Sequence, residues 1–246
     1  MDKNTILIAA IALLGGFIGG FLLANSMNRA EMTALRAGTP RPAANSTTGS
    51  QPGSETLSPE EIKAKIAEAD SNPDNFAFQK SLGVGLYRYG AMKQDLEVLE
   101  QSARILTRAS SLDPKDFDVL VSLGHAHFDV GYAKRDQKQF DKARAIYNQA
   151  LTLKPDDSDV RADLGISYFV QPSPDLTKAA VELQKVADAD PRHDRSMQFL
   201  VEIYVKQNKI PEAERTLAKI KEINAANPAI ADLTSMITEA KGGPAR

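Results

Sequence analysis

The chain has 246 residues, of which 25% are charged and 42% hydrophobic. This composition is typical of globular proteins and excludes a wholly disordered chain or a multi-span membrane protein. With 30 Lys and Arg against 32 Asp and Glu, the net charge is -2, so the basic excess of a nucleic-acid-binding protein is missing and no nucleic-acid partner is expected. The absence of cysteine excludes disulfides, thiolate metal sites and a cysteine nucleophile.

The first predicted element is an apolar segment that follows a short tail, residues 1–4. Residues 5–25 contain no charge and are almost continuously hydrophobic. A helix of about 20 such residues is about 30 Å long, the thickness of a bilayer core. We expect a single-pass anchor in the lipid bilayer, because the apolar region of a signal peptide is shorter, about 7–15 residues. A signal peptide cleaved near Ala24-Asn25-Ser26 is the alternative.

Four glycines within this segment are spaced for close helix packing. They form two overlapping pairs, Gly15 with Gly19 and Gly16 with Gly20. Residues four apart share a helix face, and missing side chains there allow two helix backbones to approach closely in a membrane. The glycines are therefore candidate packing residues for self-association or for contact with another membrane protein. The alternative is that glycine is simply common in membrane helices.

The charges that flank the apolar segment leave its orientation open. Lys3 precedes the segment, whereas Arg29, Arg36 and Arg41 follow it. Lys and Arg are usually more frequent on the cytoplasmic side of a membrane helix, so these charges alone favour a cytoplasmic location for the rest of the chain. One anchor followed by a Ser/Thr/Pro-rich linker is, however, a common layout for an exported domain. We expect a protein of the cell (inner) membrane with a periplasmic or otherwise extracytoplasmic domain, and a cytoplasmic domain is the alternative.

Residues 36–58 are predicted to form a disordered linker. They include three prolines and three glycines among Ser, Thr and Ala, and Leu57 is their one aliphatic residue larger than alanine. Such a segment buries too little apolar area to offset the loss of chain entropy on folding. The folded domain is therefore expected at 59–241, where apolar residues recur at helical spacing and no alternating strand pattern is found.

A repeat of 41 residues organises this domain. Within it a Leu-Gly pair recurs at Leu82, Leu123 and Leu164, and a turn proline at Pro73, Pro114 and Pro155. A fourth, weaker unit follows Pro191. The repeats are expected at about 73–113, 114–154, 155–190 and 191–228, with a C-terminal capping helix at 229–241.

These residues resemble the tetratricopeptide repeat (TPR) family, whose unit has Leu-Gly and Tyr on one helix, small residues on a second helix, and a closing proline. The third unit matches this pattern with Leu164, Gly165, Tyr168, Ala179 and Pro191. The resemblance implies an all-α solenoid of about four helix pairs with capping helices, since one pair cannot cover its own apolar face. The first two units are seven residues longer than the family's 34, which lengthens either both helices or the loop between them.

The resemblance also implies which positions face the concave side of the solenoid. Among these positions Tyr87, Phe128 and Phe169 are aromatic and 41 residues apart. Rings of this kind anchor a bound peptide and nearby charges set its register, although the rings could equally be packing residues. The predicted partner-binding groove consists of Lys80, Tyr87, Arg88, His125, Phe128, Asp129, Ile166, Phe169, Phe199 and Glu202.

No catalytic or metal-binding pattern accompanies the repeats. His125 and His127 fall on different faces of a helix, and neither a nucleophile elbow nor a phosphate-binding glycine loop is found. We expect no enzyme activity, metal or cofactor, and a membrane-anchored scaffold or adaptor for a protein or peptide partner. The alternatives are a homo-oligomeric structural component of a membrane complex, or an assembly factor similar to the membrane-attached TPR proteins of bacterial cytochrome c maturation.

Overall fold

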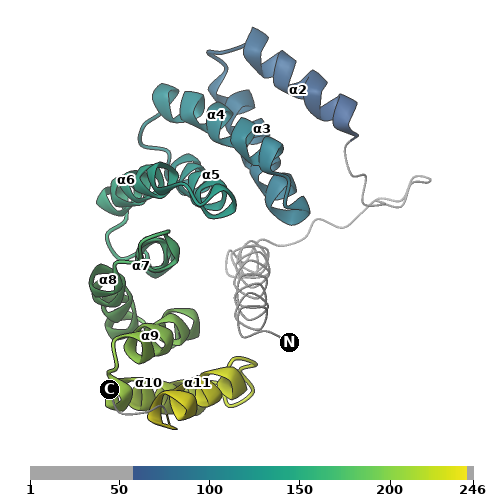
Figure 1. The fold of residues 1–246 in the computed structure, drawn as a ribbon. Helices are drawn as coiled ribbons and strands as arrows, with labels where there is room; N and C mark the ends of the chain where they lie inside the picture. The colour runs from purple at the N-terminus through teal and green to yellow at the C-terminus, as the bar shows by residue number, and fades with distance from the viewer. Residues whose placement is uncertain (1–57, 243–246) are drawn as a thin grey trace, which may run out of the picture. The chain divides into compact units, whose positions relative to one another are not determined.

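The computed structural model describes residues 58–242 (Figure 1). The chain divides into two units, Met1–Glu61 and Ile62–Arg246, and nearly all of the described residues belong to the second. The predicted anchor, with Gly15, Gly16, Gly19 and Gly20, lies outside the described residues, as does the predicted linker up to residue 57. Within 58–242, no helix is both long enough and apolar enough to cross a membrane.

Every regular element between residues 58 and 242 is an α-helix. In chain order the helices are α2 (Pro59–Ser71), α3 (Phe76–Lys93), α4 (Leu96–Leu112), α5 (Phe117–Lys134), α6 (Gln137–Leu153), α7 (Ser158–Val170), α8 (Leu176–Ala189), α9 (Asp194–Lys206), α10 (Ile210–Ile223) and α11 (Ile230–Gly242).

The helices of the second unit pack as four consecutive pairs. These pairs are α3–α4, α5–α6, α7–α8 and α9–α10, and α11 packs on both helices of the last one (Figure 1). Each second helix also contacts the first helix of the next pair, so the apolar face of one pair is covered by its neighbour. This arrangement confirms the predicted all-α solenoid for the described part of the chain.

The extra residues of the first two repeats lie in the helices. The helices α3 to α6 have 18, 17, 18 and 17 residues, whereas α7 to α10 have 13, 14, 13 and 14. The turns remain short, because Gln94 and Arg135 adopt left-handed φ values of 54° and 53° directly after their helices. The next residues, Asp95 and Asp136, then cap the following helices by accepting from backbone N–H groups.

The glycine of each Leu-Gly pair lets the two helices of a repeat cross closely. A Cβ atom on Gly83 would lie 2.7 Å from Cγ of Leu106, and one on Gly165 would lie 2.8 Å from Cγ of Leu183. At Gly124 the ring of Tyr147 occupies the same space. Larger residues at these positions would push the second helix away from the first.

Both ends of the row of pairs are covered by single helices. At the N-terminal end, Gln79 of α3 donates from Nε2 to the carbonyl oxygens of Ala69 and Asn72, at 2.7 and 2.9 Å. At the C-terminal end, Leu233 and Ile237 of α11 join an apolar cluster with residues of α9 and α10. Apolar contacts also hold α2, because its Ile62 and Ala69 join a buried cluster with Leu86 of α3 and Ile105 of α4.

Candidate protein-interaction surface

The inner side of the row is formed by the first helix of each pair. The helices α3, α5, α7 and α9 contact one another in succession, whereas α4, α6 and α8 have no comparable mutual contacts in the described part of the chain. In a curved stack the inner helices lie closer together than the outer ones. The first helices therefore line the concave side of this unit (Figure 1).

The ten predicted partner-binding residues all lie on these four helices, but their exposure differs. The aromatic and aliphatic members Phe128, Ile166, Phe169 and Phe199 are buried, Lys80, Tyr87, His125, Asp129 and Glu202 are half-buried, and Arg88 is exposed.

The three aromatic residues spaced by 41 positions have three different environments. Phe128 is 5% exposed and its ring meets that of Phe140 on α6 edge-on, with centroids 5.5 Å apart. Phe169 meets Phe199 of the next inner helix at 5.8 Å, and Tyr87 lies 5.6 Å from the His125 ring. These rings therefore do not form one open row, and the position of Phe128 agrees with the packing alternative.

Lys80 connects the first repeat to the second. Its Nζ lies 2.7 Å from Oδ2 of Asp116 and 3.4 Å from Oδ2 of Asp118. Asp116 also caps α5 by accepting from the backbone N–H of Val119. Burial raises the pKa of the Asp116 carboxyl, but the hydrogen bonds from Lys80 and Val119 outweigh it and lower that pKa overall.

Asp163 of α7 stands at the centre of a second polar connection. Its Oδ1 accepts from Nη1 of Arg195 on α9, and its Oδ2 meets Nε2 of His125 on α5, both at 2.7 Å. The Asp163 side chain is only 6% exposed. A buried carboxylate needs such partners, because leaving it unpaired is costly. Three successive inner helices are thereby joined by one carboxylate.

Two further acids on the inner helices have raised pKa values. Burial, with a contribution from nearby Asp163, raises the pKa of Asp129 to about 6, although His125 opposes the shift. Burial raises the pKa of Glu202 to about 7, and Lys206 opposes this shift. Burial also raises the pKa of Tyr87, and the charge of nearby Asp129 adds to this shift. The inner face therefore contains carboxyl groups that take up protons near neutral pH.

Asp116, Asp163 and Arg195 were not among the predicted groove residues. Spacing gives a signal for them: Lys80 precedes Asp116 by 36 residues, and Asp163 lies 38 residues after His125 and 32 before Arg195. These separations are close to one repeat. Opposite charges about one repeat apart could therefore have been read as links between neighbouring inner helices.

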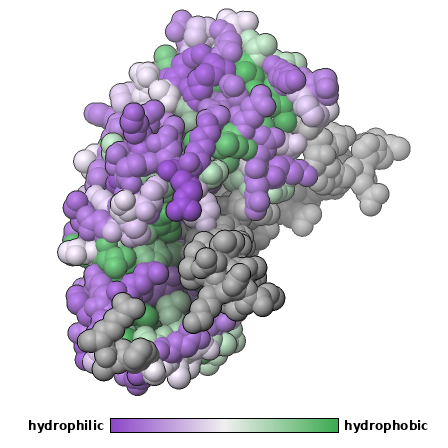
Figure 2. Space-filling model, viewed as in Figure 1, coloured by the Kyte–Doolittle hydropathy of each residue, from purple (hydrophilic) through white to green (hydrophobic). Residues whose placement is uncertain are grey.

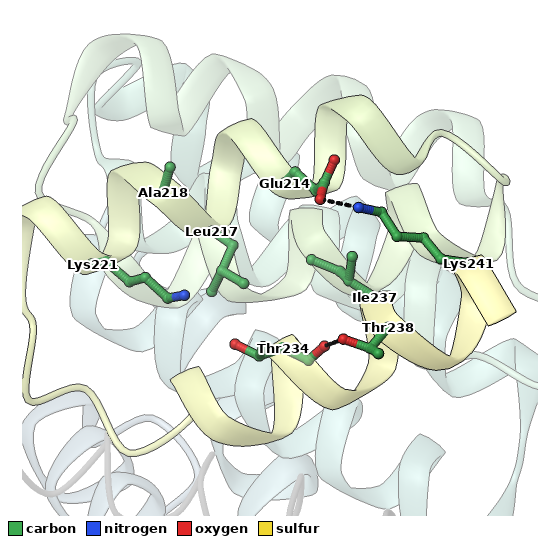
Figure 3. Close-up of a pocket in the computed structure, with 8 residues that line it drawn as sticks. All are labelled: Glu214, Leu217, Ala218, Lys221, Thr234, Ile237, Thr238 and Lys241. Atoms are coloured by element: carbon green, nitrogen blue, oxygen red, sulfur yellow. Dashed lines mark hydrogen bonds and ion pairs between the residues drawn. The ribbon is translucent and has the colours of Figure 1, made fainter.

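Two small cavities lie apart from the predicted groove residues. One of about 230 Å³ opens between α10 and α11, and its residues are labelled in Figure 3. Glu214 and Lys241 form an ion pair across it, and the Leu217 and Ile237 side chains lie beside it. The other, of about 390 Å³, is lined by residues of α8, of the start of α7 and of the turn before it. Within residues 58–242, no group of three or more His, Asp and Glu side chains is placed to hold a metal ion.

The surface of the described residues is mainly hydrophilic on the face shown in Figure 2. Five large apolar side chains are exposed, each on a different helix: Met92, Leu112, Leu153, Val181 and Ile223. Single exposed apolar residues are normal on a protein surface. They do not mark a binding site of their own.

Two family models, both described as tetratricopeptide repeat, match the sequence at residues 124–157 and 174–237. A search of curated proteins finds no match.

Solved structures share the fold at low sequence identity. The crystal structure of MamA protein is 19% identical, with a TM-score of 0.54, and the match covers 76% of this chain and 86% of that one. MamA 41-end from Desulfovibrio magneticus RS-1 is 18% identical with a TM-score of 0.54, over 69% and 86% of the two chains. TTC0263, a thermophilic TPR protein of Thermus thermophilus, is 16% identical with a TM-score of 0.51, over 74% and 89%.

Proposed function

Because the chain belongs to the tetratricopeptide repeat family, we propose that it is a scaffold that binds a partner protein or peptide on the concave side of its helical domain. The observation that carries this proposal is the succession of four first helices along that side, which together present a continuous surface from four separate repeats. A surface of this kind suits an extended or helical segment better than a small molecule.

Polar side chains on that surface that form no bond within the domain indicate where a partner would make contact. Among the described residues, Arg88 is exposed and Glu202 half-buried, and neither forms a hydrogen bond or ion pair. Lys80, His125 and Asp129, by contrast, are engaged in links between neighbouring helices. A partner would gain more from polar groups that are not already bonded within the domain. We therefore assign Arg88 and Glu202 as the first contacts.

Site-specific crosslinking in cells tests this assignment. A photoreactive amino acid replaces Arg88 in one variant and Glu202 in another, and the matched control replaces Val181, which is 49% exposed on the second helix α8. The proposal expects the same partner to be joined at both inner positions and not at Val181. Equal crosslinking at Val181, or none at either inner position, would refute it.

We further propose that the apolar segment 5–25 anchors this scaffold in the cell membrane, with the domain on the extracytoplasmic side. The length of the segment supports the anchor, and a tether of about 20 residues would keep the domain near its membrane complex and raise the local concentration of partners.

Extraction with alkaline carbonate tests the anchor, because full release of the protein from the membrane would contradict it. A reporter fused to the C-terminus, active on only one side of the membrane, tests the orientation.

Self-association and assembly of cytochrome c are the two other roles suggested by the sequence. Light scattering of the full chain in detergent tests the first, because a monomer argues against a homo-oligomeric structural component. Normal cytochrome c maturation in cells that lack the protein would argue against the second.

A further inference from the structure

Ionisable side chains from five helices meet on the inner side of the domain. This inner ionic cluster consists of Tyr87 on α3, His125 and Asp129 on α5, Tyr147 on α6, Asp163 on α7 and Arg195 on α9.

The contacts of the cluster run from repeat to repeat. Asp163 is bonded at 2.7 Å to both His125 and Arg195. The His125 ring lies 5.6 Å from the Tyr87 ring and 5.8 Å from that of Tyr147, and Tyr87 also interacts electrostatically with Asp129. All four inner helices are therefore joined through a single group of side chains.

Two polar atoms of the cluster lack a hydrogen-bond partner. The Tyr147 hydroxyl and the Nε–H group of Arg195 are buried and have no hydrogen-bond partner. Buried polar groups are nearly always paired in stable structures. This connection between the repeats is thus polar, buried and only partly bonded, whereas Leu106 of α4 and Leu123 of α5 belong to an apolar cluster.

The charge of the cluster depends on one proton. With both carboxylates ionised, two negative charges face the positive charge of Arg195. A proton on Asp129 removes one of these two negative charges. Two carboxylates that share a partly buried site resist being ionised together, so the uptake of this proton belongs to the group rather than to one residue.

Three of the named groups reach Asp129 from helices that pack against α5: Tyr87 from α3, Tyr147 from α6 and Asp163 from α7. Arg195 lies on α9, the next inner helix after α7. The remaining neighbour, α4, contacts α5 through an apolar cluster that includes Leu106.

We propose that the inner ionic cluster is a pH-dependent link between repeats. It holds the first helices of neighbouring repeats together when it carries this proton, and it loosens when the proton is lost. This device does not depend on the proposed partner binding. It would alter the spacing of the inner helices, and with it the curvature of the row, as the pH changes around the domain.

The absence of native cysteine allows a direct distance measurement on the full chain. Spin labels at Lys93→Cys and Lys206→Cys mark the C-terminal ends of α3 and α9, outside the cluster. We expect the distance distribution to be narrow at pH 5 and to become broader or shifted at pH 8, with a midpoint near pH 6. The same distribution at both pH values would overturn the proposal.

Asp129→Asn is the decisive variant, because the amide has nearly the same shape as the carboxyl group and cannot ionise. We expect its distance distribution at pH 8 to match that of the unsubstituted chain at pH 5. The matched control is Asp118→Asn, because the Asp118 side chain lies on the same helix and is 75% exposed. This control variant should keep the pH response. A pH response that survives in Asp129→Asn would overturn the proposal. Should that variant fail to fold, the pH response of the unsubstituted chain alone decides.

Discussion

The ring of Tyr147 on α6 fills the space beside Gly124 of α5 in which any larger residue would place its Cβ atom. Tyr147 is fully buried, so its ring cannot swing into solvent. We expect Gly124→Ala to lower the free energy of unfolding by about 1–3 kcal/mol, the usual cost of overpacking a core. Chemical denaturation measures this loss.

Gly85 provides the matched control for that substitution. It lies on α3 with no atom within 4 Å of a Cβ built on it. Alanine is favoured over glycine inside a helix by about 0.5–1 kcal/mol. Gly85→Ala should therefore raise the free energy of unfolding, and a loss as large as that of Gly124→Ala would contradict the close crossing of α5 and α6.

The Tyr147 hydroxyl gives a second prediction, because it is buried without a hydrogen-bond partner. Removing a buried hydroxyl that has no hydrogen-bond partner should not lower the free energy of unfolding. Tyr147→Phe should therefore be as stable as the unsubstituted chain or more stable. Tyr204→Phe is the comparison, since the Tyr204 hydroxyl donates to Oε1 of Gln184 at 2.9 Å. That variant should lose about 0.5–1.5 kcal/mol in thermal unfolding. The reverse order would show that Tyr147 has a partner.

Hydrogen bonds from the amide of Gln79 contribute to the attachment of α2, beside the apolar contacts of Ile62 and Ala69. Gln79→Leu would leave the carbonyl oxygens of Ala69 and Asn72 without this donor, at a cost of about 1–3 kcal/mol. Hydrogen exchange by mass spectrometry should show faster exchange in α2, with α11 unchanged as the internal control. Equal exchange in α2 of both proteins would mean that its apolar contacts suffice.

The ion pair of Lys80 with Asp116 predicts a dependence on acid pH. The pKa of Asp116 is lowered in the folded chain, so the stability that it contributes is present above its unfolded pKa, about 3.9, and is lost as the pH falls through its folded pKa. Asp116→Asn keeps a capping side chain for α5 but loses the charge. It should be less stable by about 1 kcal/mol at pH 7 and equal to the unsubstituted chain at pH 2 in urea unfolding. A difference that persists at pH 2 would contradict the ion-pair account.

The sequence predicted the helices and their pairing well, because the Leu-Gly pairs and the turn prolines recur with the repeat. It could not decide where the seven extra residues lie, since seven residues are close to two helical turns and also fit a loop. The structure places them in helices such as α3 and α5, which are closed by left-handed Gln94 and Arg135. Nothing in the local sequence marks these two residues for that conformation.

The candidate surface was predicted less completely than the fold. Helical spacing determines that Lys80 and His125 lie on first helices, but not whether a side chain of the next repeat reaches them. That depends on how far each helix pair is shifted and rotated relative to the next pair. In this structure the arrangement places Asp116 beside Lys80 and Asp163 beside His125. Arg88 lies on the same inner side and is exposed.

The affinity of the full chain for the partner captured by crosslinking tests the central claim most directly. Isothermal titration would compare Arg88→Glu on the inner helix α3 with Arg215→Glu on α10, where the Arg215 side chain is 70% exposed. We predict that Arg88→Glu weakens binding at least about tenfold, or about 1.4 kcal/mol, and that Arg215→Glu leaves it unchanged. Equal affinities of both variants and the unsubstituted chain would contradict binding on the concave side.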